Sequence, residues 1–143
     1  MRFAGLGEIA DEVVVRIEVP RGSFVKRRPD GSVDFVSPLP CPYNYGSIEG
    51  TMGADGDPLD AIVLGTRRAL GTGAHVGVRA VMGFVDDGVL DPKVVCSTRV
   101  LTTAERRGIE RFFRVYAIFK RTVNRLRGRT GRTACTGWLR PGA

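Results

Sequence analysis

The segment from Asp55 to Asp60 carries three carboxylates within six residues, placed around a glycine and a proline that force a turn. Acidic side chains this close repel one another, and each raises the pKa of its neighbours. A divalent cation bound through oxygen atoms, Mg²⁺ or Mn²⁺, would remove that repulsion. The competing interpretation is an acidic turn on the protein surface, and these six residues alone favour neither.

The strand that follows this turn also points to a cation. Leu59–Leu64 is an apolar run whose alternation puts Asp60 on the same face as Ile62 and Leu64. A carboxylate on an apolar face costs free energy unless it is paired with a cation or bound to a metal. The strand therefore predicts a positive partner for Asp60.

A second acidic group follows a second apolar strand. The segment His75–Asp86 alternates along its length, and Asp86 extends its apolar face. A turn then leads to Asp91, and Lys93, two residues later, should point the same way. Two acidic clusters, each attached to the end of an apolar strand, favour a metal site with two or more ions. His75, the only histidine, lies on the other face, and we interpret it as a structural or surface residue.

Two further candidates lie earlier in the chain. Glu18 stands near the end of the alternating strand Glu12–Val19, and a surface ion pair with Arg16 is its competing interpretation. Tyr45 begins a short strand after an irregular, proline-rich segment. Of Tyr43 and Tyr45, we expect one to pack in the core and the other to offer its hydroxyl to a site.

A basic hairpin lies between these two candidates. Arg21–Arg28 leads through the turn Pro29-Asp30-Gly31 into a short strand, Val33–Val36. This pattern is typical of a β-hairpin, and it gathers Lys26, Arg27 and Arg28 near the bend. The competing interpretation is a hairpin whose cations are simply solvated.

An amphipathic helix dominates the rest of the chain. Thr102 to Glu105 forms a capping box, and an apolar stripe with helical spacing follows: Ile109, Phe112, Phe113, Tyr116 and Val123. Tyr116 belongs to this stripe, so core packing with a solvated hydroxyl competes with a role in a site. Thr133–Leu139 adds a last short strand. Short strands separated by glycine and proline turns, followed by one helix, predict a mainly β chain with some α structure, in which a small closed β-barrel carries a packed C-terminal helix.

Length and composition set broad limits. The 143 residues are enough for one domain, 1–143, with a sizeable core. No apolar run reaches the roughly 18 residues of a membrane span, and the N-terminus does not resemble a secretory signal. Three widely separated cysteines, Cys41, Cys96 and Cys135, indicate neither a disulfide framework nor a zinc site, and they fit a reducing cytoplasm.

The charge is unevenly distributed. Residues 1–98 carry 10 basic and 13 acidic groups, whereas residues 99–143 carry 12 and 2. A positive C-terminal third would serve an anionic substrate, a nucleic acid or a partner surface, and composition does not choose among them. Nucleic acid is the least favoured of the three, because no aromatic residues alternate with the arginines on an evident open face.

Taken together, these residues resemble the soluble, Mg²⁺-dependent inorganic pyrophosphatases of the single-domain bacterial type. Asp55 to Asp60 is similar to that family's Asp-Gly-Asp-Pro-x-Asp signature, which is highly specific. The other matching segments are Glu18 to Pro20, Lys26, Asn44 to Gly46, Asp86 with Asp91 to Lys93, and Phe112 to Tyr116. The resemblance covers about Val13 to Trp138.

The resemblance implies a fold and an activity. The fold would be an OB-like five-stranded barrel with flanking helices, assembled as a homo-oligomer, commonly a hexamer. The activity would be hydrolysis of pyrophosphate to two phosphates with Mg²⁺, or alternatively Mn²⁺. Asp55, Asp60 and Asp91 would hold one metal ion, and Asp60 would bridge to a second. Asp86 and Asp91 would hold a metal that arrives with the substrate, and Glu18 would be a further metal ligand.

The resemblance also implies roles for other residues. Asp57 would accept the proton of the attacking water, and Tyr45 would take part in catalysis. Substrate contacts would come from Lys26, Arg28, Tyr45, Lys93 and Tyr116.

The chain departs from the family pattern at several positions, and an arginine that the family has before its proline-rich segment is absent around Val33 to Phe35. Arg28 stands where the family has a glutamate, Cys41 where a tyrosine is usual, and Ala117 where a lysine is frequent, although Lys120 follows one turn later. A guanidinium does not bind Mg²⁺ but grips phosphate well, so our hypothesis is that Arg28 replaces a metal as a partner of the substrate. Two alternatives stay open: a diverged enzyme acting on another small phosphoanhydride, or a binding protein that uses the Arg-rich C-terminal third for an anionic partner.

Overall fold

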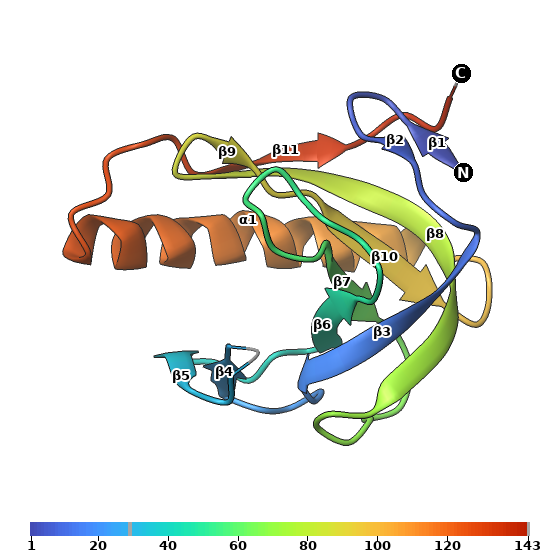
Figure 1. The fold of residues 1–143 in the computed structure, drawn as a ribbon, viewed down its shortest axis with the longest axis horizontal. Helices are drawn as coiled ribbons and strands as arrows, with labels where there is room; N and C mark the ends of the chain where they lie inside the picture. Colours follow the sequence, from blue (N-terminus) through green and yellow to red (C-terminus); the bar gives the residue numbers. More distant parts are fainter. Residues whose placement is uncertain (29, 143) are drawn as a thin grey trace.

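The computed structural model describes residues 1–28 and 30–142, so Pro29 of the predicted turn lies outside the described residues. The elements follow one another along the chain as labelled in Figure 1. The strands are β1 Arg2–Phe3, β2 Gly7–Glu8, β3 Glu12–Val19, β4 Val25–Arg27, β5 Val33–Val36, β6 Asn44–Ile48, β7 Asp60–Val63, β8 Gly73–Asp86, β9 Val89–Leu90, β10 Lys93–Ser97 and β11 Ala134–Trp138. The helix α1 spans Thr103–Leu126.

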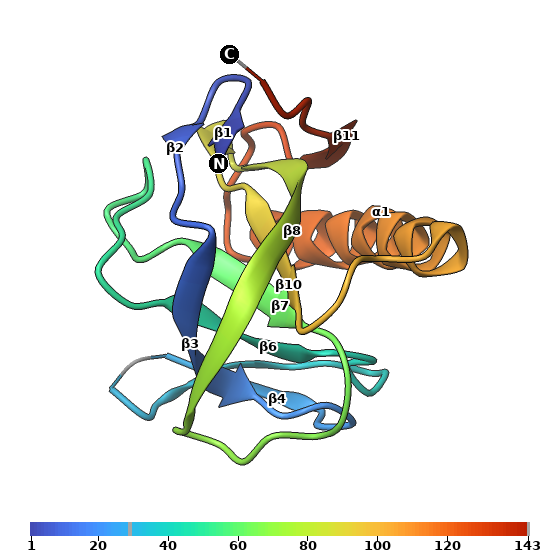
Figure 2. The same cartoon turned by 90° about the vertical axis from the view of Figure 1, so that its right-hand side faces the viewer.

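Five of these strands form a ring. β3 pairs with β6 and β8, β6 pairs with β7, and β7 runs parallel to β10. β10 then pairs antiparallel with β8, which returns the ladder to its start. Because β8 is 14 residues long, its first part pairs with β3 and its last part with β11 as it curves across the molecule (Figure 2). The prediction of a mainly β chain whose strands close on one another is confirmed.

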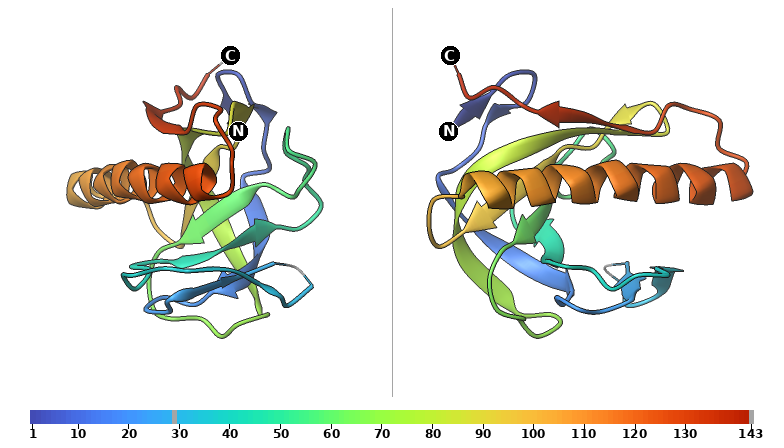
Figure 3. Two further views of the ribbon diagram at one scale, coloured as in Figure 1. Left: turned by 90° about the vertical axis from the view of Figure 1, so that its left-hand side faces the viewer. Right: turned by 180° about the vertical axis from the view of Figure 1, so that it is seen from behind.

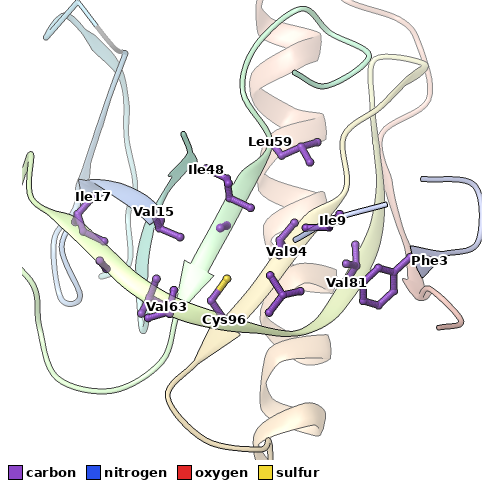
Figure 4. Packing of buried hydrophobic residues seen from close by; sticks show 14 residues of the cluster. Phe3, Ile9, Val15, Ile17, Ile48, Leu59, Val63, Val81, Val94 and Cys96 are labelled. Carbon is purple, nitrogen blue, oxygen red and sulfur yellow. The ribbon is translucent and has the colours of Figure 1, made fainter. Parts of the chain in front are cut away.

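The two faces of the ring bury different apolar clusters, as the period of two along a strand requires. One face gathers Val15, Ile17, Val63, Val94 and Cys96 with their neighbours (Figure 4). The other face packs against α1, and its members include Ile62, Met82, Val95, Ile109 and Phe113. The site described below lies at one end of this second cluster.

The helix forms as its local sequence predicts. Thr102 Oγ1 accepts a hydrogen bond from the Glu105 amide at 3.1 Å, and the Thr102 amide donates to Glu105 Oε1 at 2.9 Å. The guanidinium of Arg99 grips both oxygens of the same carboxylate, at 2.8 and 2.9 Å. From this start α1 runs across the sheet, against β8 and β11 (Figure 3). Within the described residues, no helix is both long enough and apolar enough to cross a membrane.

The predicted basic hairpin is present as β4 and β5, which pair only with each other in a small separate sheet. Side chains join it to the helix. The Phe35 and Phe119 rings lie 5.3 Å apart, and Arg127 donates to the Asp34 backbone oxygen at 2.7 Å. The hairpin therefore stands beside the ring and reaches the end of α1, which puts its inward residues next to the site.

Candidate active site

The centre of the site is the buried ammonium group of Lys93. Its side chain is 1% exposed, and Nζ donates to Asp60 Oδ2 at 2.7 Å, to Asp91 Oδ2 at 2.8 Å and to the Tyr45 hydroxyl at 3.0 Å. Two features of the backbone bring these groups together. Lys93 and Asp60 are direct partners in the parallel β10–β7 ladder, and Asp91 lies two residues before Lys93. The cation that pairs with Asp60 in this structure is therefore Lys93, whereas the divalent cation predicted for Asp60 stays a prediction.

The charges at this centre are strongly coupled. Burial opposes the ionised form of Asp60, but Lys93 and then Lys26 outweigh it and lower the pKa of Asp60 to about 2. Burial similarly opposes the charged form of Lys93, and Asp60 with Asp91 nevertheless raise its pKa. The pKa of Asp91 is raised by burial and by the charges of Asp60 and Asp55, against the pull of Lys93. One ammonium group thus compensates two carboxylates only in part.

Tyr45 is the buried member of the tyrosine pair. Burial first, and the charge of Asp60 second, raise its pKa, so the phenol stays neutral. Its hydroxyl donates to Asp60 Oδ2 at 2.8 Å, and this residue therefore both packs in the core and offers its hydroxyl to the site. The tyrosine of the helix stripe, Tyr116, is half-buried, with the Lys93 ammonium 5.8 Å from its ring centroid.

Lys26 enters from the hairpin. Its ammonium lies 5.2 Å from the Tyr45 ring centroid and 3.8 Å from Asp34 Oδ2. Burial opposes its charge, but Tyr116 and Asp60 outweigh burial and raise the pKa of Lys26. A cavity of about 450 Å³ opens here, between the hairpin, the proline-rich segment and α1, and Lys26, Tyr45 and Tyr116 line it.

Glu18 lies near the end of β3, close enough to Asp60 and Asp57 for their charges to act on it. Its carboxylate accepts from Ser47 Oγ at 3.1 Å. Burial, and to a smaller extent the charges of Asp60 and Asp57, raise the pKa of Glu18. Arg16 pairs with Glu49 instead, so the surface ion pair between Arg16 and Glu18 is the wrong interpretation.

Asp55 and Asp57 occupy the exposed turn before β7. The Asp57 amide donates to Asp55 Oδ1 at 3.0 Å, and Gly56 between them adopts a positive φ of 85° that favours glycine. This turn explains the glycine of the motif. Within residues 1–28 and 30–142, no three His, Cys, Asp or Glu side chains lie close enough to form a metal-binding group.

Two residues of α1 contact the Asp86 carboxylate, and the sequence analysis did not predict either contact. Asn124 Nδ2 donates to Asp86 Oδ1 at 2.7 Å, and the Lys120 ammonium lies 3.8 Å from Asp86 Oδ2. Both residues are buried on the inward face of α1. Lys120 and Asn124 are four residues apart and continue the helical spacing of Ile109 and Phe113. This spacing could have predicted that they lie on the inward face of the helix.

Arg28 lies on the outer part of the hairpin. Its guanidinium donates to the Val33 backbone oxygen at 2.9 Å and to Asp34 Oδ1 at 3.3 Å, and its side chain is exposed. Among the other departures, Cys41 lines the cavity and burial raises the pKa of its thiol, while Ala117 is buried on the helix.

Comparison with known proteins identifies relatives of the chain. The family model for inorganic pyrophosphatase matches residues 14–138. The inorganic pyrophosphatase of Gluconobacter oxydans is 36% identical over 98 residues, which cover 62% of this chain and 56% of the relative. That of Haemophilus influenzae is 41% identical over 88 residues, covering 55% of this chain and 49% of the relative. The matched segment thus spans about half the length of these curated relatives.

Solved structures agree over a larger part of the chain. An inorganic pyrophosphatase from Thermus thermophilus superposes with a TM-score of 0.75 at 27% identity, covering 96% of this chain and 87% of that one. An inorganic pyrophosphatase from Neisseria gonorrhoeae gives a TM-score of 0.70 at 28% identity, covering 90% and 82%. The shared fold confirms the OB-like arrangement predicted from the sequence.

Proposed function

Because the chain belongs to the inorganic pyrophosphatase family, we propose that it hydrolyses pyrophosphate to two phosphates with the help of a divalent cation, Mg²⁺ or Mn²⁺. The observation that carries the proposal is the cluster of Lys93, Asp60, Asp91 and Tyr45, which joins residues from three of the segments that resemble the family. The five carboxylates named from the sequence supply the metal ligands in this proposal, and the lysines and tyrosines supply the contacts to phosphate.

The residues fit divalent cations by their chemistry and their charge. The candidate ligands Glu18, Asp55, Asp60, Asp86 and Asp91 are all carboxylates, the hard oxygen donors that Mg²⁺ prefers. Neighbouring carboxylates contribute to the raised pKa values of Glu18 and Asp91, so negative charge in the site is incompletely compensated. Asp55, Asp60 and Asp91 would hold one cation, and Asp86 with Asp91 another, once these side chains draw closer together than they lie among the described residues. When bound, such ions polarise phosphoryl oxygens and lower the pKa of the attacking water.

The other residues act on the substrate or on the proton. Asp57 lies exposed at the turn, beside Asp55 and near enough to Glu18 to influence its pKa, and it accepts the proton of the attacking water. Lys93 and the Tyr45 hydroxyl keep Asp60 ionised and oriented. Lys26 and Tyr116 line the adjoining cavity and bind phosphoryl oxygens.

Arg28 is not among the proposed contacts. Two of its hydrogen-bond donors already serve Val33 and Asp34 within the hairpin. The metal-replacing role predicted for Arg28 would use the other donors of its exposed guanidinium, and it stays a prediction.

Phosphate release from pyrophosphate, measured with Mg²⁺ and then with a chelator, tests the proposal directly. Activity should require the metal, and Asp57→Asn should lower turnover by about 10²–10⁴-fold, the usual loss of a general base. Asp87→Asn is the matched control, since it removes a different carboxylate, one that accepts a hydrogen bond from the Gly131 amide. Equal turnover in Asp57→Asn and wild type would exclude Asp57, and absence of hydrolysis by wild type would contradict the proposed function.

We also propose, from the family resemblance, that the protein assembles into a homo-oligomer, commonly a hexamer in this family. The outward side of α1 supports self-association, because Val115 and Ile118 are 52% and 60% exposed there. Sedimentation equilibrium measures the assembled mass, and a mass of one chain at micromolar concentration would contradict the proposal.

A further inference from the structure

Lysine occurs at only three positions in this chain: Lys26, Lys93 and Lys120. The other nineteen of the 22 basic residues are arginines. All three lysine side chains are largely removed from solvent, with exposures of 19%, 1% and 9%. A lysine carries a compact point charge with three rotatable donors, whereas arginine presents a rigid planar fork. The chain thus places its few compact cations inward, around one region.

The three ammonium groups are linked through aromatic rings. The Tyr45 ring centroid lies 5.7 Å from the Lys93 ammonium and 5.2 Å from that of Lys26. The Phe35 ring centroid lies 5.8 Å from the Lys26 ammonium and 5.6 Å from that of Lys120. The three ammonium groups and two rings therefore form a connected series, which begins at Lys93 in the reaction centre and ends at Lys120 on the inward face of α1.

The three lysines differ in how well their charges are satisfied. Lys93 donates to three acceptors at 3.0 Å or less. For Lys26 and Lys120, the nearest carboxylate oxygens in the described part of the chain belong to Asp34 and Asp86, at 3.8 Å each. That distance is too long for a hydrogen bond, so each pair attracts at a distance without saturating the ammonium donors. Within the described residues, the buried side-chain atoms without a partner are Arg68 Nε and Asn124 Oδ1, so the ammonium groups of Lys26 and Lys120 keep some contact with solvent, from which an anion can approach.

The carboxylates beside these two lysines are engaged by other groups. Asp34 Oδ1 accepts hydrogen bonds from the guanidinium groups of Arg28 and Arg127, each at 3.3 Å. Asp86 Oδ1 receives the Asn124 amide at 2.7 Å. Each carboxylate thus attracts a lysine but makes its closest contacts with other residues. The two ammonium groups therefore remain able to donate to an anion.

We propose that Lys120 is a phosphate-binding residue, and that its ammonium and that of Lys26, which approach the same Phe35 ring, bind the same diphosphate anion. This inference rests on the proposed function, since it extends the substrate contacts of that site along the helix. A diphosphate has two charged ends, which suits two ammonium groups that lie beside the same ring. The competing explanation is that Lys120 only balances the charge of Asp86.

Binding of imidodiphosphate, a diphosphate analogue with a P–N–P link, separates these explanations. Calorimetric titration at fixed Mg²⁺ gives its dissociation constant without turnover. Lys120→Met keeps most of the length of the side chain and removes the charge, and we expect it to weaken binding by about ten- to hundredfold, as for lost hydrogen bonds to a charged group. Arg125→Met is the matched control, because it removes the same charge from an exposed position of the same helix. It should change the dissociation constant by less than about twofold.

The melting temperature supplies a second measurement. A lysine that only balances Asp86 would lower the melting temperature when replaced and leave imidodiphosphate affinity unchanged, and this result would overturn the proposal. Equal weakening by Lys120→Met and Arg125→Met would also overturn it, because a general charge effect would then suffice. If Lys120→Met does not fold, Lys120→Gln takes its place with the same expected loss.

The behaviour of the wild-type protein separates this inference from the function on which it rests. Wild-type protein that hydrolyses pyrophosphate, together with a Lys120→Met variant of unchanged affinity, would remove Lys120 alone from the site. Wild-type protein that neither binds imidodiphosphate nor hydrolyses pyrophosphate would overturn both.

Discussion

Lys93 shows how a single residue organises the site. Its ammonium lies between two carboxylates in a buried setting, where unpaired charges are far more costly than on the surface. The two carboxylates are therefore stabilised only while Lys93 is present or while another cation takes its place. A divalent metal is such a cation, so the stability of the fold and the affinity of the site for metal are linked through this residue.

We expect Lys93→Met to lower the free energy of unfolding by about 3–5 kcal/mol in the presence of a chelator, because two buried carboxylates lose their shared partner. Excess Mg²⁺ should restore part of this loss, and more than it stabilises wild type. Urea unfolding with chelator and with Mg²⁺ measures both effects. Arg114→Met is the control, since it breaks only the exposed pair with Glu110 and should cost about 1 kcal/mol or less. Similar losses in the two variants would contradict the central role of Lys93.

At this scale the sequence predicts part of the cluster. The spacing of Asp91 and Lys93 predicts that they share a face, and their ammonium–carboxylate contact confirms it. The apolar face of β7 predicts a cation for Asp60. It does not predict which one, because the parallel pairing of β7 with β10 joins segments about 30 residues apart and leaves no local signal.

Among the elements, the helix is the most predictable because its start is encoded locally. The capping box satisfies amide groups at the first turn, and the Arg99–Glu105 pair adds a charge-assisted contact to it. Strands β3 and β5 have the predicted bounds, and β7, β8 and β11 differ from the predicted ranges by one or two residues at one or both ends. The strands β1, β2 and β9 were missed, since two residues are too few to show alternation.

The helix start also predicts a dependence on pH. Hydrogen bonds from Arg99 and from the Thr102 amide lower the pKa of Glu105 to about 2, below its ordinary value of 4.5. A lowered pKa in the folded state adds stability above pH about 4.5, and this stability is lost as the pH falls toward about 2. We expect Glu105→Gln to lose stability at pH 7 and to show a shallower decline between pH 4.5 and 2. Urea midpoints across this range measure it, and an unchanged acid limb would contradict the assignment.

At the scale of the whole molecule, the ring and the hairpin differ in how they are held. The ring strands share two apolar clusters on their opposite faces and close on one another through β8. The periodicity of the sequence predicted a barrel. It did not predict the order of the strands, because the closure depends on pairings between segments that are distant in the sequence. The hairpin β4–β5 has its own sheet and is tied to α1 by few side chains, chiefly those of Asp34 with Arg127 and Phe35 with Phe119.

This difference leads to a prediction about local opening. Amides of β4 and β5 should exchange with solvent at a free energy several kcal/mol below that of β3 and β8, because fewer buried contacts oppose the opening of the hairpin. Imidodiphosphate with Mg²⁺ should slow exchange in β4 and β5 more than in β3, since Lys26 would hold the anion against the ring. Hydrogen exchange followed by mass spectrometry measures both.

A pair of variants ties this opening to its cause. Arg127→Ala removes the link from the helix end to Asp34 and should speed exchange of the hairpin, whereas Arg125→Ala, an exposed arginine on the same helix, should not. Because the opened hairpin carries Lys26 away from Tyr45, Arg127→Ala should also raise the KM for pyrophosphate while the melting temperature of the ring stays close to that of wild type. Hairpin exchange as slow in Arg127→Ala as in Arg125→Ala would show that the apolar contact of Phe35 with Phe119 alone holds the hairpin in place.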